Sequence, residues 1–116
     1  MTTRQEKVNS LIQREISSYL LTEGWEGISG LLTITRVEVS PDLGQAKVFF
    51  SVVGQDSEEV LAVLQKHLYQ IQGRLLERLR MKTVPRVTFL VDQSGEYAQH
   101  IGKLLHELHD HDQKSS

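Results

Sequence analysis

Residues 37–49 have the sequence VEVSPDLGQAKVF. On each side of the central SPDLG, apolar residues alternate with polar ones, which is typical of strands with one buried face. Pro presets the backbone of a turn, Asp bonds its own backbone locally, and Gly tolerates a tight return of the chain. We therefore predict an antiparallel hairpin, with strands over 31–39 and 46–53 and a turn between them.

Helical patterns lie on both sides of this hairpin. Apolar residues recur at helical spacing over 4–21, and the glycine-punctuated stretch that follows indicates a loop. After the hairpin, Asp56 and Glu59 form a capping-box pattern and open a long helix, whose apolar stripe continues across Gly73. Pro85 stops that helix. The hairpin is thus expected to lie between two amphipathic helices.

The rest of the chain completes the fold. A third strand is predicted over 86–92, where apolar and polar residues alternate, and a last helix over 96–109. Residues 110–116 are polar, and we expect them to form a disordered tail. Residues 1–109 then form one domain in the order helix, strand, strand, long helix, strand, helix. This order predicts an α+β fold of the type II KH-like kind, with a three-stranded mixed sheet and helices packed on one face.

The composition narrows the class of protein. A chain of 116 residues with 39% hydrophobic and 24% charged residues is typical of one soluble globular domain. It contains no cysteine, so it can form neither a disulfide nor a thiolate metal site. Neither an apolar leader nor a membrane-spanning run is evident, and we expect a cytoplasmic protein with no membrane partner.

Basic residues concentrate in one segment, although the formal net charge is −2. Residues 65–90 carry six Lys and Arg residues against one acidic residue, Glu77. Local cations, not the whole-chain total, determine the affinity for phosphate. The segment therefore indicates a nucleic-acid partner, and the alternative is a solvated helix face without a ligand.

An RNA-binding role is predicted for a set of cationic and aromatic side chains. Guanidinium and ammonium groups bind phosphate, and an aromatic ring stacks on a base. The candidates lie on the long helix, in the segment after it, or on one face of the first helix: Arg74, Arg78, Arg80, Lys82, Lys66, Tyr69, Lys7 and Arg14. The alternative is that Tyr69 and Leu76 pack against a neighbouring element while the arginines are only solvated.

Several stretches in the right order resemble the ribosome-binding factor A family. These are residues 37–49, residues 78–85 (RLRMKTVP), and residues 92–94 followed by apolar residues at 101, 104 and 105. The resemblance covers about residues 4–108. It implies a KH-like fold that binds the free small ribosomal subunit and its rRNA, assists late maturation of that rRNA, and has no enzymatic activity. It also implies a ribosome-associated GTPase as a partner, and we expect a monomer.

The resemblance also implies a kink in the long helix. Family members replace the KH glycine loop with a kink, commonly Ala-x-Gly, between two half-helices. Ile71-Gln72-Gly73 is the matching stretch, so Gly73 is the kink candidate, with Ile in place of Ala. Alignment backwards from Pro85 without a gap instead places Tyr69 at the glycine position. Either the second half-helix is shortened here, or the kink has lost its glycine.

Other chemistries find little support in the sequence. A phosphate-binding loop, a nucleophile elbow and a paired acid–base constellation are all missing, so we expect neither an enzyme nor a cofactor. His106 and His109 lie one helical turn apart, but the end of a chain does not supply the converging ligands of a metal site. We expect no bound metal. The alternative function is a protein-interaction module whose basic helix docks an acidic partner.

Overall fold

The computed structural model describes residues 3–23 and 25–93. Its elements, in chain order, are α1 (Arg4–Glu23), β1 (Leu31–Val39), β2 (Gln45–Val53), α2 (Ser57–Lys66), α3 (Leu68–Leu79) and β3 (Arg86–Val91). The first helix and the three strands are confirmed, with no bound more than two residues from its prediction. The predicted helix over 96–109 and the predicted tail over 110–116 lie outside the described residues.

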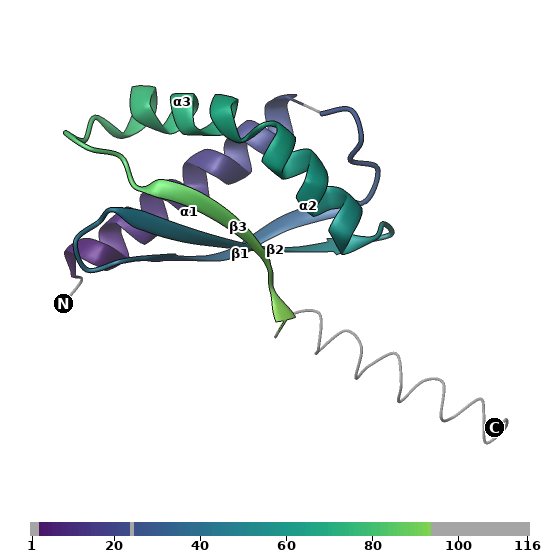
Figure 1. The fold of residues 1–116 in the computed structure, drawn as a ribbon, viewed down its shortest axis with the longest axis horizontal. Coiled ribbons are helices and arrows are strands. Elements are labelled where there is room, and N and C mark those ends of the chain that lie inside the picture. The colour runs from purple at the N-terminus through teal and green to yellow at the C-terminus, as the bar shows by residue number, and fades with distance from the viewer. Residues whose placement is uncertain (1–2, 24, 94–116) are drawn as a thin grey trace, which may run out of the picture.

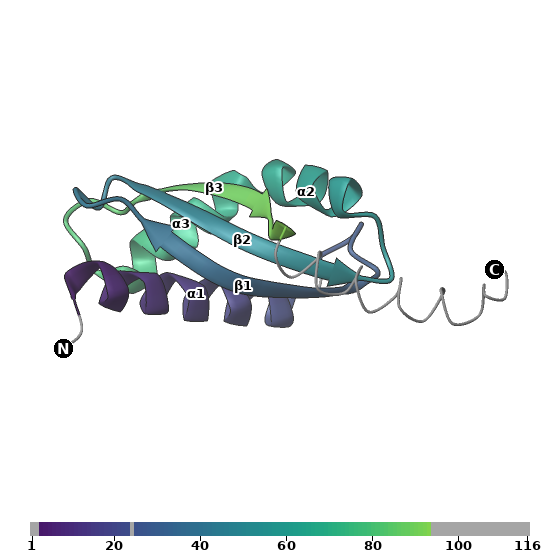
Figure 2. The same cartoon turned by 90° about the horizontal axis from the view of Figure 1, so that it is seen from below.

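The strands form one mixed sheet in the order β1-β2-β3. β1 and β2 pair antiparallel, as the hairpin requires, and β2 and β3 pair parallel because the chain crosses over through α2 and α3. The three helices lie on one face of the sheet (Figure 1), and the view from below turns the other face toward the reader (Figure 2). The predicted α+β fold with a three-stranded mixed sheet is therefore confirmed.

The core lies between this sheet and the helices. On β2, the buried residues Ala46, Val48 and Phe50 alternate with more exposed ones, and Val87 and Phe89 are the buried partners on β3. The helices add side chains that are at most 1% exposed: Ile12, Ile16, Val60, Leu64, Ile71 and Leu75. Each such side chain contributes roughly 1.5–3 kcal/mol by leaving water. None of the helices in the described part of the chain is long and apolar enough to cross a membrane.

The turn between β1 and β2 follows the predicted chemistry. The Leu43 amide donates to the Ser40 carbonyl oxygen at 2.8 Å and closes the turn. Asp42 Oδ1 accepts from Ser40 Oγ at 2.7 Å and from the Gly44 amide at 2.9 Å. These two hydrogen bonds, the Ser40 bond foremost, hold the pKa of Asp42 below its ordinary value. Leu43, with φ 61°, takes the left-handed conformation in this turn.

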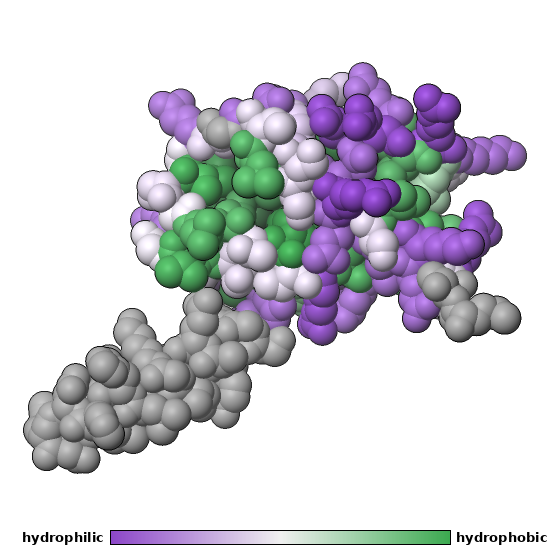
Figure 3. All heavy atoms as spheres, turned by 180° about the vertical axis from the view of Figure 1, so that it is seen from behind, coloured by the Kyte–Doolittle hydropathy of each residue, from purple (hydrophilic) through white to green (hydrophobic). Residues whose placement is uncertain are grey.

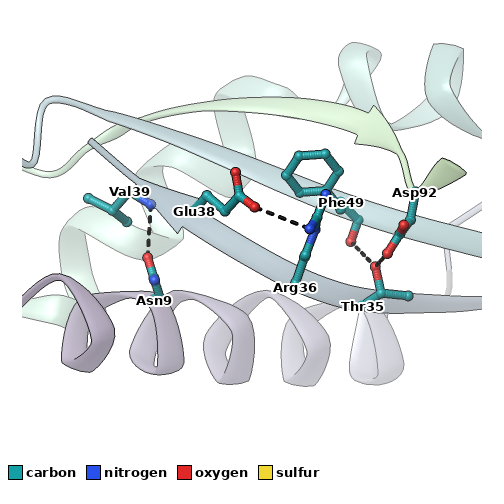
Figure 4. Close-up of polar contacts among 7 residues, drawn as sticks. All are labelled: Asn9, Thr35, Arg36, Glu38, Val39, Phe49 and Asp92. Atoms are coloured by element: carbon teal, nitrogen blue, oxygen red, sulfur yellow. Dashed lines mark hydrogen bonds and ion pairs between the residues drawn. The ribbon is translucent and has the colours of Figure 1, made fainter. Parts of the chain in front are cut away.

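A β-bulge interrupts β1 at Thr35. The pairing with β2 shifts between Ile34 and Arg36, so Thr35 is the extra residue. Its hydroxyl donates to the buried carboxylate of Asp92 and lies 3.3 Å from the Phe49 carbonyl oxygen (Figure 4). Because of the extra residue, the alternation changes phase within β1.

Because of this change of phase, apolar side chains on both sides of the bulge face the core. Ile34 before the bulge and Val37 after it are both buried, although they are three residues apart. On the opposite face, the Arg36 guanidinium lies 4.0 Å from the Phe49 ring centre and pairs with Glu38 at 3.2 Å (Figure 4). The sheet therefore has one buried face and one face that carries charged side chains.

Side-chain amides of α1 cover the outer edge of β1. Gln5 and Gln13 donate through Nε2 to the carbonyl oxygens of Val39 (2.9 Å) and Ile34 (3.0 Å). Asn9 Oδ1 accepts from the Val39 amide at 2.9 Å (Figure 4). The three residues are spaced four apart, so successive turns of α1 place one amide each along the strand.

The outer edge of β3 is covered in the same way by α3. Gln72 Nε2 donates to the Pro85 carbonyl oxygen at 2.7 Å, and Gln72 Oε1 accepts from the Val87 amide at 3.1 Å. A single glutamine thus satisfies two backbone groups at the start of β3. Both edge strands of the sheet are hydrogen-bonded to helix side chains.

The predicted long helix is two helices that meet at His67. His67 has φ −100° and ψ 11°, a conformation open to any L-residue, so the break requires no glycine. The helical hydrogen bonds nearly continue through it, since the His67 amide reaches the carbonyl oxygens of Val63 and Leu64, both at 3.2 Å. The His67 ring stacks on Trp25 with ring centres 4.4 Å apart. This stacking holds the break against the loop after α1.

The kink predicted at Gly73 is therefore wrong in position. Gly73 lies inside α3, and apart from its own helical turn no atom of the described residues lies within 4 Å of a Cβ placed on it. Of the two alternatives, the structure agrees with a kink that has lost its glycine, and Tyr69 follows the break by two residues. The helix also ends earlier than predicted, at Leu79, because Arg80 takes the left-handed conformation that caps it.

Helix capping also differs from the prediction. Asp56 is the N-cap residue of α2, but its side chain makes no capping hydrogen bond. A capping box forms instead at the start of α1. There the Thr3 hydroxyl accepts from the Glu6 amide at 3.1 Å, and Glu6 Oε1 accepts from the Thr3 amide at 2.9 Å.

Candidate nucleic-acid interface

Two of the predicted RNA-binding arginines lie between α1 and α3. The Arg74 guanidinium lies 4.9 Å from the Tyr19 ring centre, and Arg78 Nε lies 3.3 Å from Glu15 Oε1. Arg74 Nε is buried and finds no hydrogen-bond partner among the described residues. We call these four residues the α1–α3 seam. Their contacts join two helices, and the predicted RNA contacts of Arg74 and Arg78 stay a prediction.

Aromatic packing extends the seam toward the helix break. The rings of Tyr19 and Trp25 meet edge to face, with centres 5.4 Å apart, and Trp25 stacks on His67. Arg74, Tyr19, Trp25 and His67 thus form a continuous stack from α3 through α1 to the break. Edge-to-face pairs of this kind add about 0.5–1.5 kcal/mol beyond area burial. The stack fixes α3 relative to α1.

The outer face of α3 carries two large side chains that nothing in the described structure covers. Tyr69 is 89% exposed and Leu76 is 61% exposed, with Gly73 exposed between them. The alternative in which Tyr69 packs against a neighbouring element is therefore wrong for the described residues. An exposed tyrosine ring is available to stack on a base.

Two further candidates of the basic segment, Arg80 and Lys82, come together at the turn end of the sheet. Arg80 and Lys82 line a cavity of about 640 Å³ with Arg4, the first residue of α1. The lining also includes the turn between β1 and β2, with Asp42 and Leu43. We call it the basic cavity. Arg4 was not among the predicted site residues, because only the packing of α1 against the hairpin brings it to the segment after α3.

The other candidates are dispersed. Lys66 is exposed at the C-terminal end of α2, while Lys7 and Arg14 are exposed on α1. None of the three lines the basic cavity. No ion pair within residues 3–23 and 25–93 involves them.

A second hollow lies at the opposite end of α1 and is apolar. It has a volume of about 460 Å³, and its lining includes Leu20, Leu21, Trp25, Ile28, Leu31 and Leu32. Figure 3 shows apolar side chains gathered toward one end of the rear face, whereas polar ones predominate toward the N-terminal end. The two ends of the molecule therefore offer different chemistry, and phosphate suits only the basic one.

The described residues were compared with the sequence expectation on metal binding. Residues 3–23 and 25–93 contain no group of three or more His, Asp or Glu side chains placed to hold a metal ion. His106 and His109 lie outside the described residues. The surface described so far suits binding of an anionic polymer.

Comparison with known proteins identifies the same family as the motifs. The sequence model of the ribosome-binding factor A family matches residues 4–105. A ribosome-binding factor A from Polynucleobacter necessarius is 34% identical over 111 residues, which cover 96% of this chain and 91% of the relative. Another from Staphylococcus epidermidis is 36% identical over 111 residues, which cover 94% of this chain and 96% of the relative.

Solved structures show the same fold. The crystal structure of ribosome-binding factor A from Thermus thermophilus superposes with a TM-score of 0.69 at 21% identity, over 77% of this chain and 97% of that one. A homology model of the Thermus thermophilus factor, fitted into a cryo-EM map of a 30S–RbfA complex, gives 0.62 at 22% identity, over 73% and 91%. With a family match from the start of α1 to beyond β3 and relatives above 30% identity over nearly the whole chain, this chain belongs to the ribosome-binding factor A family.

Proposed function

We propose that this protein is a ribosome-binding factor that binds the free small ribosomal subunit through its rRNA and assists the late maturation of that rRNA. The family match over residues 4–105 carries the proposal. The likeness to a factor whose model was fitted into a 30S–RbfA complex supports the small subunit as the partner.

The surface supports an RNA partner. Tyr69 on the outer face of α3 offers a ring for base stacking, and Arg80 and Lys82 offer cations for phosphate. Lys66, Lys7 and Arg14 are exposed and would add general phosphate attraction. Arg74 and Arg78 contribute less in this proposal, because their charges already face Tyr19 and Glu15.

We further propose that the protein acts in the cytoplasm as a monomer, by binding and without catalysis. The family resemblance supports a ribosome-associated GTPase as a second partner. Binding alone can guide assembly, since a ligand that prefers one conformation of the subunit shifts the population toward it.

Sedimentation tests the proposal directly. The purified chain is mixed with purified bacterial small subunits, large subunits or assembled ribosomes, and each mixture is separated on a sucrose gradient. We expect the chain to co-migrate with free small subunits and to be depleted from assembled ribosomes. A chain that stays at the top of all three gradients at low salt contradicts the proposal.

A cellular measurement tests the maturation step separately. Cells that lack the protein should accumulate precursor forms of the small-subunit rRNA, and the wild-type gene should restore processing. Normal processing in those cells, with subunit binding intact in vitro, limits the function to binding.

A further inference from the structure

Two residues with a left-handed backbone conformation line the basic cavity. Leu43 (φ 61°) and Arg80 (φ 52°) are the non-glycine residues with positive φ in the described part of the chain. Both line the same cavity, although 37 positions separate them in the sequence. L-residues with a branched or long side chain rarely take this conformation, and such strain tends to persist where function requires it.

Glycine would be the ordinary residue at the position of Arg80. Most helices that end with a left-handed cap use glycine there, since it has no Cβ to clash. Arg80 caps α3 in this conformation with φ 52° and ψ 39°. The strain is retained together with a guanidinium group, which indicates that the side chain is needed at this place. An attraction between Arg80 and the helix dipole offers an alternative reason, and it would require no ligand.

The cationic side chains of the basic cavity form no ion pair with other described residues. No ion pair or side-chain hydrogen bond within residues 3–23 and 25–93 involves Arg4, Arg80 or Lys82, and all three are exposed. Asp42 is the acidic residue in the lining, so three cations and one anion leave a charge of +2. Asp42 Oδ1 is already bonded by Ser40 and Gly44. The cations therefore remain available to an external anion.

The surroundings favour a polynucleotide over a small anion. Tyr69 and Leu76 lie at positions i and i+7 on one stripe of α3 and are both exposed, and Arg80 is the cap residue that follows the last residue of this helix. At 1.5 Å per residue, the tyrosine and the arginine are about 16 Å apart along the helix. A polymer of bases and phosphates can reach a stacking ring and a cationic cavity at this separation, whereas a free phosphate ion cannot.

We propose that the basic cavity binds a backbone phosphate of RNA, with Arg80 as the main contact and Arg4 and Lys82 beside it. The proposal rests on the proposed function, because it names the place where this chain holds the rRNA backbone. It moves the phosphate contacts from the middle of α3 to its C-terminal end.

The Arg80→Gly variant tests the proposal, because glycine removes the charge and relieves the strained backbone together. We expect its melting temperature to stay the same or rise. Its affinity for purified small subunits should fall by roughly tenfold at about 0.1 M salt, and the slope of log affinity against log salt should decrease by about 0.9. Arg80→Lys keeps the charge and should retain most of the affinity. Arg36→Gln, on the open sheet face, removes an equal charge and should bind as the wild type does.

Three results would overturn the assignment. If Arg80→Gly folds and binds like the wild type while the wild type binds subunits, the cavity is not a contact and the proposed function stands. If the wild type binds no subunits, the proposed function itself fails. If inorganic phosphate displaces subunits at constant ionic strength, the cavity is a site for free phosphate. Should Arg80→Gly not fold, Lys82→Ala in the following loop provides the same comparison.

Discussion

The α1–α3 seam and the basic cavity use the same kind of side chain on the same short segment for opposite purposes. In the seam, Arg74 and Arg78 contact Tyr19 and Glu15, and the Arg74 Nε is buried. In the cavity, Arg80 is exposed and no ion pair of the described chain involves it. Only Leu79 lies between Arg78 of the seam and Arg80 of the cavity, yet the seam arginines join two helices and Arg80 is open to solvent.

The difference shows that clustered cations of one segment can have different partners within the fold. A cation contributes to phosphate binding only if it is not already matched by a group of its own chain. The partners of the seam arginines come from α1, and Arg78 and Glu15 are 63 positions apart in sequence. Only the tertiary structure distinguishes a structural arginine from a binding one.

The largest effect is expected from charge reversal in the cavity. Arg80→Glu combined with Lys82→Glu should lower the affinity for small subunits by roughly tenfold for each lost phosphate contact near 0.1 M salt. The melting temperature should change little, because both side chains are exposed. Filter binding or fluorescence anisotropy over a salt series measures both the affinity and its slope.

The matched reversal in the seam should act mainly on stability. Arg74→Glu combined with Arg78→Glu makes the same change in net charge, but it removes the contact with Tyr19 and places a carboxylate beside Glu15. We expect a loss of about 1–2 kcal/mol in the free energy of unfolding, measured by urea denaturation. The Arg78 side chain is 55% exposed, so most of the loss should come from Arg74. If this pair binds weakly but unfolds normally, the division between seam and cavity is wrong.

A smaller effect is expected from Gly73, on the exposed face of α3 between the two regions. Beyond the backbone of α3 itself, the added methyl group meets no atom of the described chain within 4 Å. Gly73→Ala should therefore stabilise the fold by up to about 1 kcal/mol through helix propensity, with subunit binding unchanged. A lower melting temperature, or weaker binding, means that Gly73 is approached closely by RNA or bends on the ribosome.

The smallest effect is expected from replacing Asp42, which lies in the lining of the basic cavity. Its pKa is lower in the folded state because Ser40 and Gly44 donate to the carboxylate. Its contribution to stability is therefore present above the unfolded pKa and is lost as the pH falls through the folded pKa. We expect the difference in urea midpoint between the wild type and Asp42→Ala to be present at pH 7 and to shrink below about pH 4. An equal difference at pH 3 and pH 7 contradicts a role for the carboxylate charge.

The sheet could be predicted from the sequence because its signals are local. Strand alternation and the Ser-Pro-Asp turn placed β1 at Leu31–Val39, the bounds observed. The bulge at Thr35 was missed, since it depends on how β1 pairs with β2 and on the hydrogen bond to Asp92. A local pattern predicts the strand, whereas the position of the bulge depends on the residues with which the strand pairs.

The helix break could not be predicted from glycine or proline. The apolar stripe runs through His67 without interruption, and the break depends on stacking with Trp25, which is distant in sequence. The capping boxes show the same limit. Asp56 and Glu59 match the pattern and do not form it, whereas Thr3 and Glu6 match it and do.

The candidate site was predicted in part. Arg80, Lys82 and Tyr69 were predicted from residue type, and all three lie exposed, as an RNA contact requires. Arg4 was missed because no pattern near residue 4 links it to residue 80. The residue types predict the chemistry of such a surface, but the tertiary packing determines which residues form it.

The two outer strands of the sheet are hydrogen-bonded to side-chain amides, which protects the sheet against aggregation. These amides belong to Gln5, Asn9, Gln13 and Gln72. An uncovered strand edge recruits strands from other chains and seeds aggregation. With backbone groups of both outer strands already hydrogen-bonded, this small sheet is a poor template for such strands.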